Sequence, residues 1–367
     1  MILLLAFLIW LYLVFLHGRF WESGPELQPA KPLTVPDVDI IVPARDEAAL
    51  IGPVIASLLA QDYPGAVRVI LVDDNSTDGT AAAAGTHERL TIISGAPKPE
   101  GWAGKLWALA QGVEASSAPL LLFTDADITH DARHLATLAA RLHAPRVDMV
   151  SEMVRLNCSS LAERLFIPAF VYFFQLLYPV ARVNDPRARI AAAAGGVVLI
   201  RREALKRIGG LESIKGALID DVTLARAVKK GGAIYLGHSG LAQSIRLYPR
   251  AADIWAMITR SAFTQLDYSA FNLAGTILGM AVVFLAAPCA IIFSGFLSWR
   301  FDLGAAIYGL MILTYRPTLL RYRQPVYLAL ALPAIAAFYM AATIASAVGF
   351  WRGTGAKWKS RAYGGAK

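Results

Sequence analysis

Three pairs of aspartates in this 367-residue sequence have the spacing of groups that hold cations or move protons. The pairs are Asp73 with Asp74, Asp125 with Asp127, and Asp220 with Asp221. Two carboxylates in one place resist joint ionisation unless a cation joins them. Mg²⁺ and Mn²⁺ take oxygen ligands, and Mg²⁺ is usually held by one or two carboxylates together with substrate phosphates. The pairs therefore suggest a site for a metal ion and a phosphate-bearing ligand, with solvated turns and helix caps as the alternative.

The pair Asp125 and Asp127 follows the apolar run "PLLLFT". If that strand extends over residues 119–127, side chains two residues apart point the same way. The two carboxylates would then converge, and both are candidate ligands of Mg²⁺ or Mn²⁺. Taken alone, the pair is explained equally well by a solvated turn.

The other two pairs stand at the ends of expected elements. Asp73 and Asp74 end the strand "VRVILVDD", where a carboxylate can accept hydrogen bonds from a base or from ribose hydroxyls. Asp220 and Asp221 begin a helix with an acidic start and a basic end, which suits the helix dipole. N-capping explains one aspartate of this pair and leaves the other unexplained. A carboxylate beside a diphosphate can take a proton from an acceptor, so the pair is the candidate general base.

Two cations are candidates for meeting phosphate, Lys105 in "GWAGKLWALA" and Arg260 in "DIWAMITRSAFTQL". Arginine offers a bidentate fork and lysine a point charge, although a solvated surface cation is the alternative for each. His130 and His134 have the spacing of a helical metal pair. Because hard cations rarely use two histidines, we expect this pair on the surface face of a helix.

An alternation of strand and helix patterns positions these residues between 38 and 270. Apolar strands are expected at residues 38–44, 67–74, 90–94 and 119–127, and helices at 47–61 and 104–116. Continuous apolar strands that alternate with helices predict an α/β fold with a mostly parallel sheet covered on both faces. Ligands of such sheets bind beyond the carboxyl ends of the strands, where the first two aspartate pairs fall.

The apolar residues concentrate at the two ends of a chain that is 56% hydrophobic, with a mean hydropathy of +0.49. Residues 1–20 predict an uncleaved transmembrane anchor, because the basic start and small-residue cleavage site of a signal peptide are missing. A proline-containing linker (21–37) follows. Within the region 271–350, residues 271–298 and 326–350 are long enough to cross a membrane, and 303–315 is a shorter apolar piece.

The segment 165–181, inside the α/β region, is nearly apolar enough to cross a membrane. A crossing there would separate two halves of one site, so we expect a helix on the membrane surface or packed against membrane segments. An ordinary core helix is the alternative.

Basic residues indicate the orientation. Arg19 and Lys31 follow the anchor, and the tail 351–367 is basic, so the positive-inside rule predicts that the domain 38–270 and the tail are cytoplasmic. The net charge of +8 is explained by attraction to anionic lipids. No basic helix with interleaved aromatics indicates nucleic-acid binding, so no nucleic-acid partner is expected.

Five stretches occur in an order that resembles the motifs of inverting family 2 glycosyltransferases of the GT-A fold. They are "IIVPARDE", "VILVDDNSTDGT", "GKLWALAQG", "LLFTDAD" and "LIDDVTLA". The stretches "GWAGKLWA", "ERLFIPAFVYFFQLLYPVARVNDP", "AAAAGGVVLIRREAL" and "TRSAFTQLDYS" further resemble the hopene-associated glycosyltransferases of hopanoid-making bacteria.

The resemblance implies a role for each matching residue. The residues that would bind the nucleotide-sugar are Pro43, Ala44, Arg45, Glu47, Asp73, Asp74, Lys105, Asp125 and Arg260. Asp74, beside Asp73, would contact the uracil or ribose, and Arg260 would stabilise the leaving diphosphate. Asp125 would contact the ribose and assist Asp127, which would hold the metal on the diphosphate.

Asp221 would be the catalytic base, with Asp220 as its neighbour. The implied reaction moves one sugar from a nucleotide-sugar, in the first instance a UDP-sugar, to a membrane lipid hydroxyl such as that of a hopanoid. It would take place on the cytoplasmic face of a bacterial inner membrane, with Mg²⁺ or Mn²⁺. The family's Q-x-x-R-W motif keeps only Arg260 here, which favours a single transfer over a processive polysaccharide synthase. A non-catalytic membrane scaffold on the same fold is the other alternative.

Overall fold

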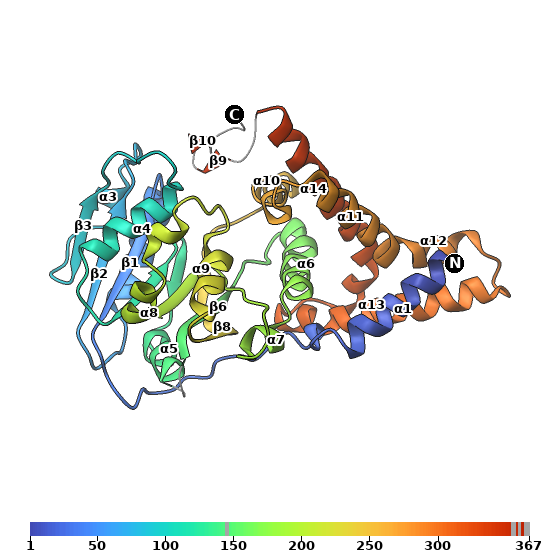
Figure 1. The fold of residues 1–367 in the computed structure, drawn as a ribbon, viewed down its shortest axis with the longest axis horizontal. Helices are drawn as coiled ribbons and strands as arrows, with labels where there is room; N and C mark the ends of the chain where they lie inside the picture. Colours follow the sequence, from blue (N-terminus) through green and yellow to red (C-terminus); the bar gives the residue numbers. More distant parts are fainter. Residues whose placement is uncertain (144–146, 354–356, 359–360, 363–367) are drawn as a thin grey trace. The chain divides into compact units, whose positions relative to one another are not determined.

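The computed structural model describes residues 1–143, 147–353, 357–358 and 361–362. The chain divides into two compact units (Figure 1). The sheet unit comprises Pro25–Asn157 and Arg182–Leu247, and the helical unit comprises Met1–Gly24, Cys158–Ala181 and Tyr248–Lys367. These limits differ from the expected domain 38–270, since residues 158–181 and 248–270 cluster with the terminal helices.

The sheet unit is built on eight strands in the order β3-β2-β1-β4-β7-β6-β8-β5. The strands are β1 (Val38–Ala44), β2 (Val67–Asp73), β3 (Leu90–Ser94), β4 (Leu120–Thr124), β5 (Ile128–His130), β6 (Val147–Arg155), β7 (Val197–Arg201) and β8 (Ala233–Ser244). Six strands (β1–β4, β6 and β8) run the same way, and β7 and β5 run antiparallel to their neighbours. The prediction of a mostly parallel α/β sheet is therefore confirmed.

Helices cover both faces of this sheet. They are α2 (Ala48–Leu59), α3 (Thr80–Ala83), α4 (Gly104–Glu114), α5 (His134–Leu142), α8 (Arg202–Arg207) and α9 (Asp220–Lys229), and the short helix α7 (Val180–Asn184) precedes β7 in the chain. Ile40 and Leu122 join the apolar cluster under α2 and α5. On the other face, α4 approaches so closely that a Cβ added to Gly112 would lie 2.4 Å from the side chain of Ile41. Alternate residues of β1 are thus buried on opposite faces, which explains its continuous apolar run.

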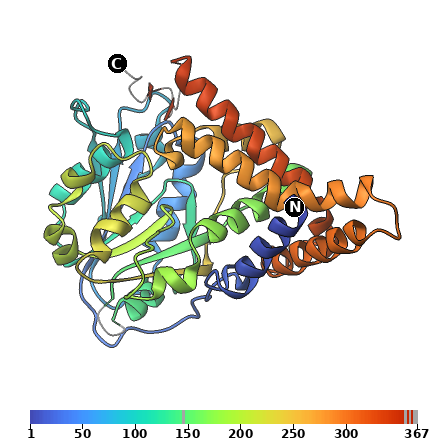
Figure 2. The same ribbon diagram turned by 45° about the vertical axis from the view of Figure 1, so that its right-hand side comes forward.

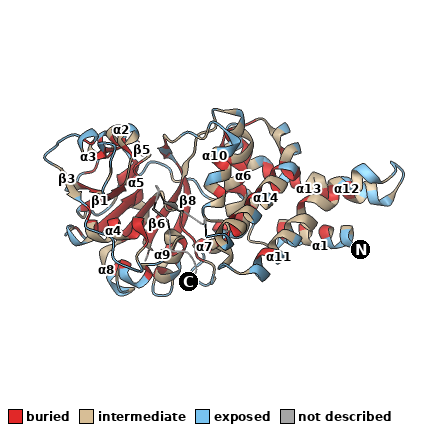
Figure 3. Cartoon of the chain, turned by 90° about the horizontal axis from the view of Figure 1, so that it is seen from above, coloured by how far each residue is buried: buried red, intermediate tan, exposed pale blue. Residues whose placement is uncertain are grey.

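Burial accounts for the stability of this arrangement. The sheet forms the buried centre in Figure 3, and every residue of β1 and β4 is buried. A fully buried Ile or Leu side chain contributes roughly 1.5–3 kcal/mol through removal of its apolar surface from water. A rigid sheet of this kind holds the loops at its edge in fixed positions.

The helical unit gathers both ends of the chain. Its helices are α1 (Ile2–Phe15), α6 (Leu161–Leu177), α10 (Ala251–Thr259), α11 (Ala270–Met280), α12 (Ala286–Phe293), α13 (Trp299–Arg321) and α14 (Leu332–Trp351). A π-helical segment, Ala281–Leu285, links α11 to α12. The first helix packs along α13 (Figure 2), and the Trp10 indole donates to the Val283 carbonyl over 2.8 Å.

In the described part of the chain, three helices are long and apolar enough to cross a membrane. They span Ala270–Phe293, Trp299–Arg321 and Val326–Trp351. The short apolar piece expected at 303–315 lies inside α13, which continues in helical form through charged residues at both of its ends. The N-terminal helix α1 has 14 residues and is shorter than these three.

The segment 165–181 contributes most of α6, which packs against α13 and α14 within the helical unit. The Tyr172 hydroxyl bonds that of Thr314 over 2.9 Å, and the Tyr339 hydroxyl donates to the Phe166 carbonyl. Of the basic tail 351–367, residues 354–356, 359–360 and 363–367 lie outside the described part of the chain. Its cytoplasmic placement stays a prediction.

Candidate active site

The carboxyl ends of β1, β2 and β4 carry most of the polar residues singled out above. Arg45 and Glu47 follow β1, Asp73 ends β2, and Asp125 follows β4. Because the three strands are parallel neighbours, their carboxyl ends lie side by side. We call this end of the sheet, across the strands, its edge. The antiparallel strand β7 starts at this same edge, since Val197 pairs with Thr124. The site is therefore assembled from loops that follow or precede adjacent strands.

Lys105 is the centre of a first cluster at this edge. Its ammonium lies 2.7 Å from an Asp125 oxygen and 3.7 Å from an Asp220 oxygen, and it donates to the Gly195 carbonyl over 3.2 Å. Lys105 stands in the first turn of α4, where the helix dipole disfavours a cation. The carboxylates of Asp125 and Asp220 offset that cost. One amine thus links α4, the loop after β4 and the start of α9.

Asp221 is held in a fixed orientation beside this cluster. Its Oδ2 accepts the Gly195 N–H over 2.8 Å, and its Oδ1 accepts the Val222 N–H over 2.7 Å. The glycine allows this approach, since a Cβ at position 195 would lie 3.0 Å from Oδ2. Gly195 was not identified as a site residue from the sequence, where only the Gly-Gly step before a strand marks it.

The charges at this edge shift one another's pKa values. Burial lowers the pKa of Lys105, but the negative charges of Asp125 and Asp220 raise it by more than burial lowers it. The pKa therefore lies above its ordinary value. The amine is therefore charged. Burial and the neighbouring Asp220 raise the pKa of Asp221 to about 7, against the opposing effect of Lys105. A carboxyl group with a pKa near neutrality can accept and release a proton at physiological pH.

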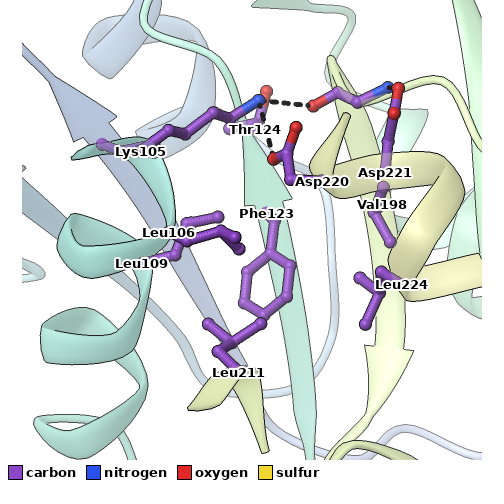
Figure 4. Close-up of a pocket in the computed structure, with 12 residues that line it drawn as sticks. Lys105, Leu106, Leu109, Phe123, Thr124, Val198, Leu211, Asp220, Asp221 and Leu224 are labelled. Atoms are coloured by element: carbon purple, nitrogen blue, oxygen red, sulfur yellow. Dashed lines mark hydrogen bonds and ion pairs between the residues drawn. The ribbon is translucent and has the colours of Figure 1, made fainter. Parts of the chain in front are cut away.

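A small pocket opens between these groups (Figure 4). Its polar part is formed by Lys105, Thr124, Gly195, Asp220 and Asp221. Its apolar part includes Leu106, Leu109, Phe123, Leu211 and Leu224, and Pro43 also lines it. Figure 4 shows the amine and the two carboxylates at one end and the apolar side chains at the other. The pocket thus places titratable groups next to an apolar surface.

Arg246 is the centre of a second cluster. Its Nε lies 2.6 Å from Asp127 Oδ2, and its Nη2 lies 2.6 Å from Glu47 Oε1. Burial and Asp125 raise the pKa of Asp127 above its ordinary value, whereas Arg246 lowers it. Arg246 was missed in the sequence, because an arginine two residues beyond a strand carries no distinctive pattern.

The remaining nucleotide-binding candidates meet one another between β1 and β2. Arg45 lies 3.7 Å from a carboxylate oxygen of the fully buried Asp74 and also donates to its carbonyl. The Asp74 N–H in turn donates to the Ala44 carbonyl over 2.8 Å. Asp73 accepts bonds from the amide and hydroxyl of Ser76 and so closes the turn after β2. In this structure Asp73 therefore shapes the loop.

The expected convergence of Asp125 and Asp127 was wrong in its geometry. Strand β4 ends at Thr124, and both aspartates lie in the turn before β5, so strand alternation does not apply to them. Asp125 faces Lys105 and Asp127 faces Arg246. Among the described residues, no group of three or more His, Cys, Asp or Glu side chains is arranged to hold a metal ion.

The expected surface position of His130 and His134 was also wrong. Both are buried, because His130 belongs to β5 and His134 begins α5 with its ring turned into the core. Their Nδ1 atoms lie 2.7 Å apart, and His134 Nε2 lies 2.6 Å from Glu152. The helical spacing was misleading because the two residues lie in different elements.

Arg260 belongs to the helical unit, where it is the C-cap of α10. Its contact with the leaving diphosphate stays a prediction.

Known proteins resemble this chain over the region that carries the site. Residues 39–209 match the sequence profile of the family Glycosyl transferase family 2. A 4,4'-diaponeurosporenoate glycosyltransferase of Staphylococcus aureus strain MRSA252 is 28% identical over 194 residues, 51% of this chain and 50% of that protein. The corresponding protein of strain USA300 is 38% identical over 91 residues, 24% of each chain. The chain thus spans half or less of the length of these relatives.

Among solved structures, a mannosyltransferase from Pyrobaculum calidifontis in complex with GDP-Man and Mn²⁺ has a similar fold. The TM-score is 0.57 and the identity 23%, over 94% of this chain and 96% of that one. The parallel sheet with its edge loops agrees with this likeness. Residues 39–209 are therefore similar in sequence to the glycosyltransferase family 2 domain, and the sheet unit has the GT-A fold.

Proposed function

We propose that this protein transfers one sugar from a nucleotide-sugar to a hydroxyl group of a membrane lipid, with inversion at the anomeric carbon. The observation that carries the proposal is the polar end of the pocket, where Asp221 is oriented by Gly195 beside the Lys105 cluster. Lys105, Asp125 and Gly195 of this cluster lie within residues 39–209, which match the glycosyltransferase family 2 profile. The apolar helices of the other unit support a membrane acceptor.

Asp221 is the proposed base. Its two backbone hydrogen bonds fix the carboxylate, and a pKa of about 7 lets it take a proton near neutral pH. As the acceptor O–H proton passes to Asp221, the oxygen attacks the anomeric carbon opposite the diphosphate. The bond from that carbon to the diphosphate oxygen breaks, and the diphosphate leaves with the electron pair. The apolar wall of the pocket excludes water that would compete with the acceptor.

Lys105 would position the two ends of the reaction. Its ammonium bridges Asp125, the proposed ribose contact, and Asp220, the neighbour of the base. It also bonds the Gly195 carbonyl, so one residue ties the donor loop to the loop that orients the base. Arg45, Asp73 and Asp74 would complete the nucleoside pocket between β1 and β2.

The chemistry of the edge suits a divalent cation. Asp125 and Asp127 offer the hard oxygen donors that Mg²⁺ and Mn²⁺ prefer, and both already attract a cation, Lys105 and Arg246 respectively. Asp127, with Asp125, would hold the ion. When bound, the ion would supply Lewis-acid charge to the leaving diphosphate. A solved structure of similar fold contains Mn²⁺, which supports this choice.

For the acceptor we propose a hopanoid-type lipid at the cytoplasmic face of a bacterial inner membrane, with α1, α11–α12, α13 and α14 as the membrane segments. The motif resemblance supports the hopanoid, and the similarity to diaponeurosporenoate glycosyltransferases supports a lipid acceptor more generally. The donor is proposed to be a UDP-sugar, with a GDP-sugar as the second candidate because the mannosyltransferase was solved with GDP-Man.

Two measurements test the proposal. Calorimetry of the purified full chain with UDP- and GDP-sugars, with and without Mn²⁺, should show metal-dependent binding of one of them. Lipid mass spectrometry of a deletion strain should show the loss of a lipid that carries one hexose-sized unit. Absence of donor binding would favour the non-catalytic scaffold, and a ladder of repeated sugars would favour the processive synthase.

A further inference from the structure

Arg246 occupies a built position at the edge of the sheet. The Ile245 N–H donates to the Asp127 carbonyl over 2.8 Å, which fixes the chain beside the aspartate. The Asn157 amide donates to the Arg246 carbonyl over 2.9 Å. The guanidinium then bridges Asp127 and Glu47 with two contacts of 2.6 Å. Charge-assisted bonds of this length are among the stronger ones in proteins.

The Arg246 guanidinium contacts a carboxylate oxygen that a metal ion would need as a ligand. Asp127 is the proposed metal ligand, and Arg246 Nε lies 2.6 Å from its Oδ2. The pair is not sealed, since 16% of the Asp127 side chain and 27% of the Arg246 side chain are exposed. A cation arriving from solvent would therefore meet a carboxylate that already carries a counter-ion.

The charges of Arg246 and of the divalent cation determine whether the cation binds Asp127. A divalent ion on Asp127 would take a carboxylate from Arg246 and would place two further positive charges beside the guanidinium. Like charges in a partly buried site repel strongly. A diphosphate relieves the repulsion, because its oxygens match the guanidinium fork and also bind the ion.

We propose that Arg246 is the resident counter-ion of Asp127 and competes with the divalent cation for it, so that the metal binds tightly only together with a nucleoside diphosphate. The inference rests on the proposed function, since it takes Asp127 as the metal ligand. It makes Arg246 a positioning residue that couples the binding of metal to the binding of donor. Coupling of this kind is reciprocal, so the metal raises the affinity for the nucleotide by the same factor.

The test is Mn²⁺ binding to the purified full chain, followed by the electron paramagnetic resonance of free Mn²⁺, with and without UDP or GDP. We expect weak binding to the unaltered protein alone and tighter binding with the nucleotide. Arg246→Met keeps the apolar stem and removes the charge. It should bind Mn²⁺ alone about tenfold more tightly, the effect of losing one charge-assisted competitor. The gain from added nucleotide should shrink.

Control variants test whether the positive charge at this position is responsible. Arg207→Met removes an arginine whose pair, Asp148, lies 2.6 Å away near the start of β6, at the opposite edge of the sheet, and it should leave Mn²⁺ binding unchanged. Arg246→Lys keeps the positive charge and should bind Mn²⁺ as weakly as the unaltered protein. If Arg246→Met melts at a lower temperature, Arg246→Gln, which also removes the charge, repeats the test.

The outcomes distinguish this proposal from the proposed function. If Asp127→Asn abolishes Mn²⁺ binding while the Arg246 variants that lack the charge bind it as the unaltered protein does, the competition is refuted and the metal site stands. Weaker binding by Arg246→Met would likewise refute it and would make Arg246 a structural clamp. If Asp127→Asn leaves Mn²⁺ binding intact, the metal position in the proposed function fails first.

Discussion

Two clusters of ionisable side chains lie next to each other in the sheet unit and differ in how their charges are satisfied. The edge cluster, in which Lys105 contacts Asp125 and Asp220 beside Asp221, is partly exposed and opens on the pocket. The histidine cluster runs from Thr124 through His130 and His134 to Glu152 and is buried throughout. The two clusters adjoin in the chain, since Thr124 directly precedes Asp125. Exposure to ligand, rather than residue type, distinguishes a candidate site from a core network.

The two clusters also differ in how they hold protons. Burial and the neighbouring His134 hold the pKa of His130 well below its ordinary value, so this ring is neutral. Its Nε2 bonds the Thr124 hydroxyl over 3.0 Å. In the edge cluster, by contrast, Asp221 titrates near neutrality. Asp221 is therefore suited to change its protonation during turnover, whereas His130 stays neutral.

The largest effect should come from Asp221→Asn. The amide keeps the size of the side chain but cannot accept the acceptor proton, so kcat should fall about 10³-fold. Initial rates of sugar transfer measure this, and donor affinity from calorimetry should change little. The matched control is Asp131→Asn, which alters a surface aspartate paired with Arg133. Normal turnover by Asp221→Asn would exclude this residue as the base.

The histidine cluster should respond in stability instead. Glu152→Ala removes the hydrogen-bond partner of the buried His134 Nε2 and should lower the free energy of unfolding by about 2 kcal/mol. Thermal unfolding of the full chain in detergent measures the loss. The transfer rate per folded molecule should stay within about twofold at a temperature where the variant is folded. A large fall in kcat without a fall in melting temperature would instead make the histidine cluster part of the reaction.

The sequence was sufficient to place the edge cluster but not the histidine cluster. The continuous apolar runs before Asp73 and Asp125 predict both the sheet and its ligand-binding edge, because parallel strands bury both faces. The position of His130 depends on the three-residue strand β5, which pairs with β8 more than 100 residues later in the chain. No local sequence pattern predicts such a pairing. Arg246 and Gly195 were missed for the same reason. Their partners are brought close only by the tertiary fold.

The smallest predicted effect is the pH dependence of the edge cluster. Asp221 must be ionised to act as base, and its pKa is raised to about 7. The ionised fraction therefore falls as pH drops through 7, and kcat/KM should fall about tenfold per unit at lower pH. Rates of transfer between pH 5.5 and 8.5 measure this. A flat profile over that range would contradict an ionised Asp221 as base.

Two substitutions in the edge cluster should move this pH profile in opposite directions. Such shifts would assign the titrating group to the edge cluster. Asp220 raises the pKa of Asp221, so Asp220→Asn should move the fall to lower pH. Lys105 lowers that pKa, so Lys105→Met should move it to higher pH. The control Lys206→Met alters an exposed lysine on α8 and should leave the profile in place. A profile that moves with Glu152→Ala and not with Asp220→Asn or Lys105→Met would assign the titration to the buried histidine cluster instead.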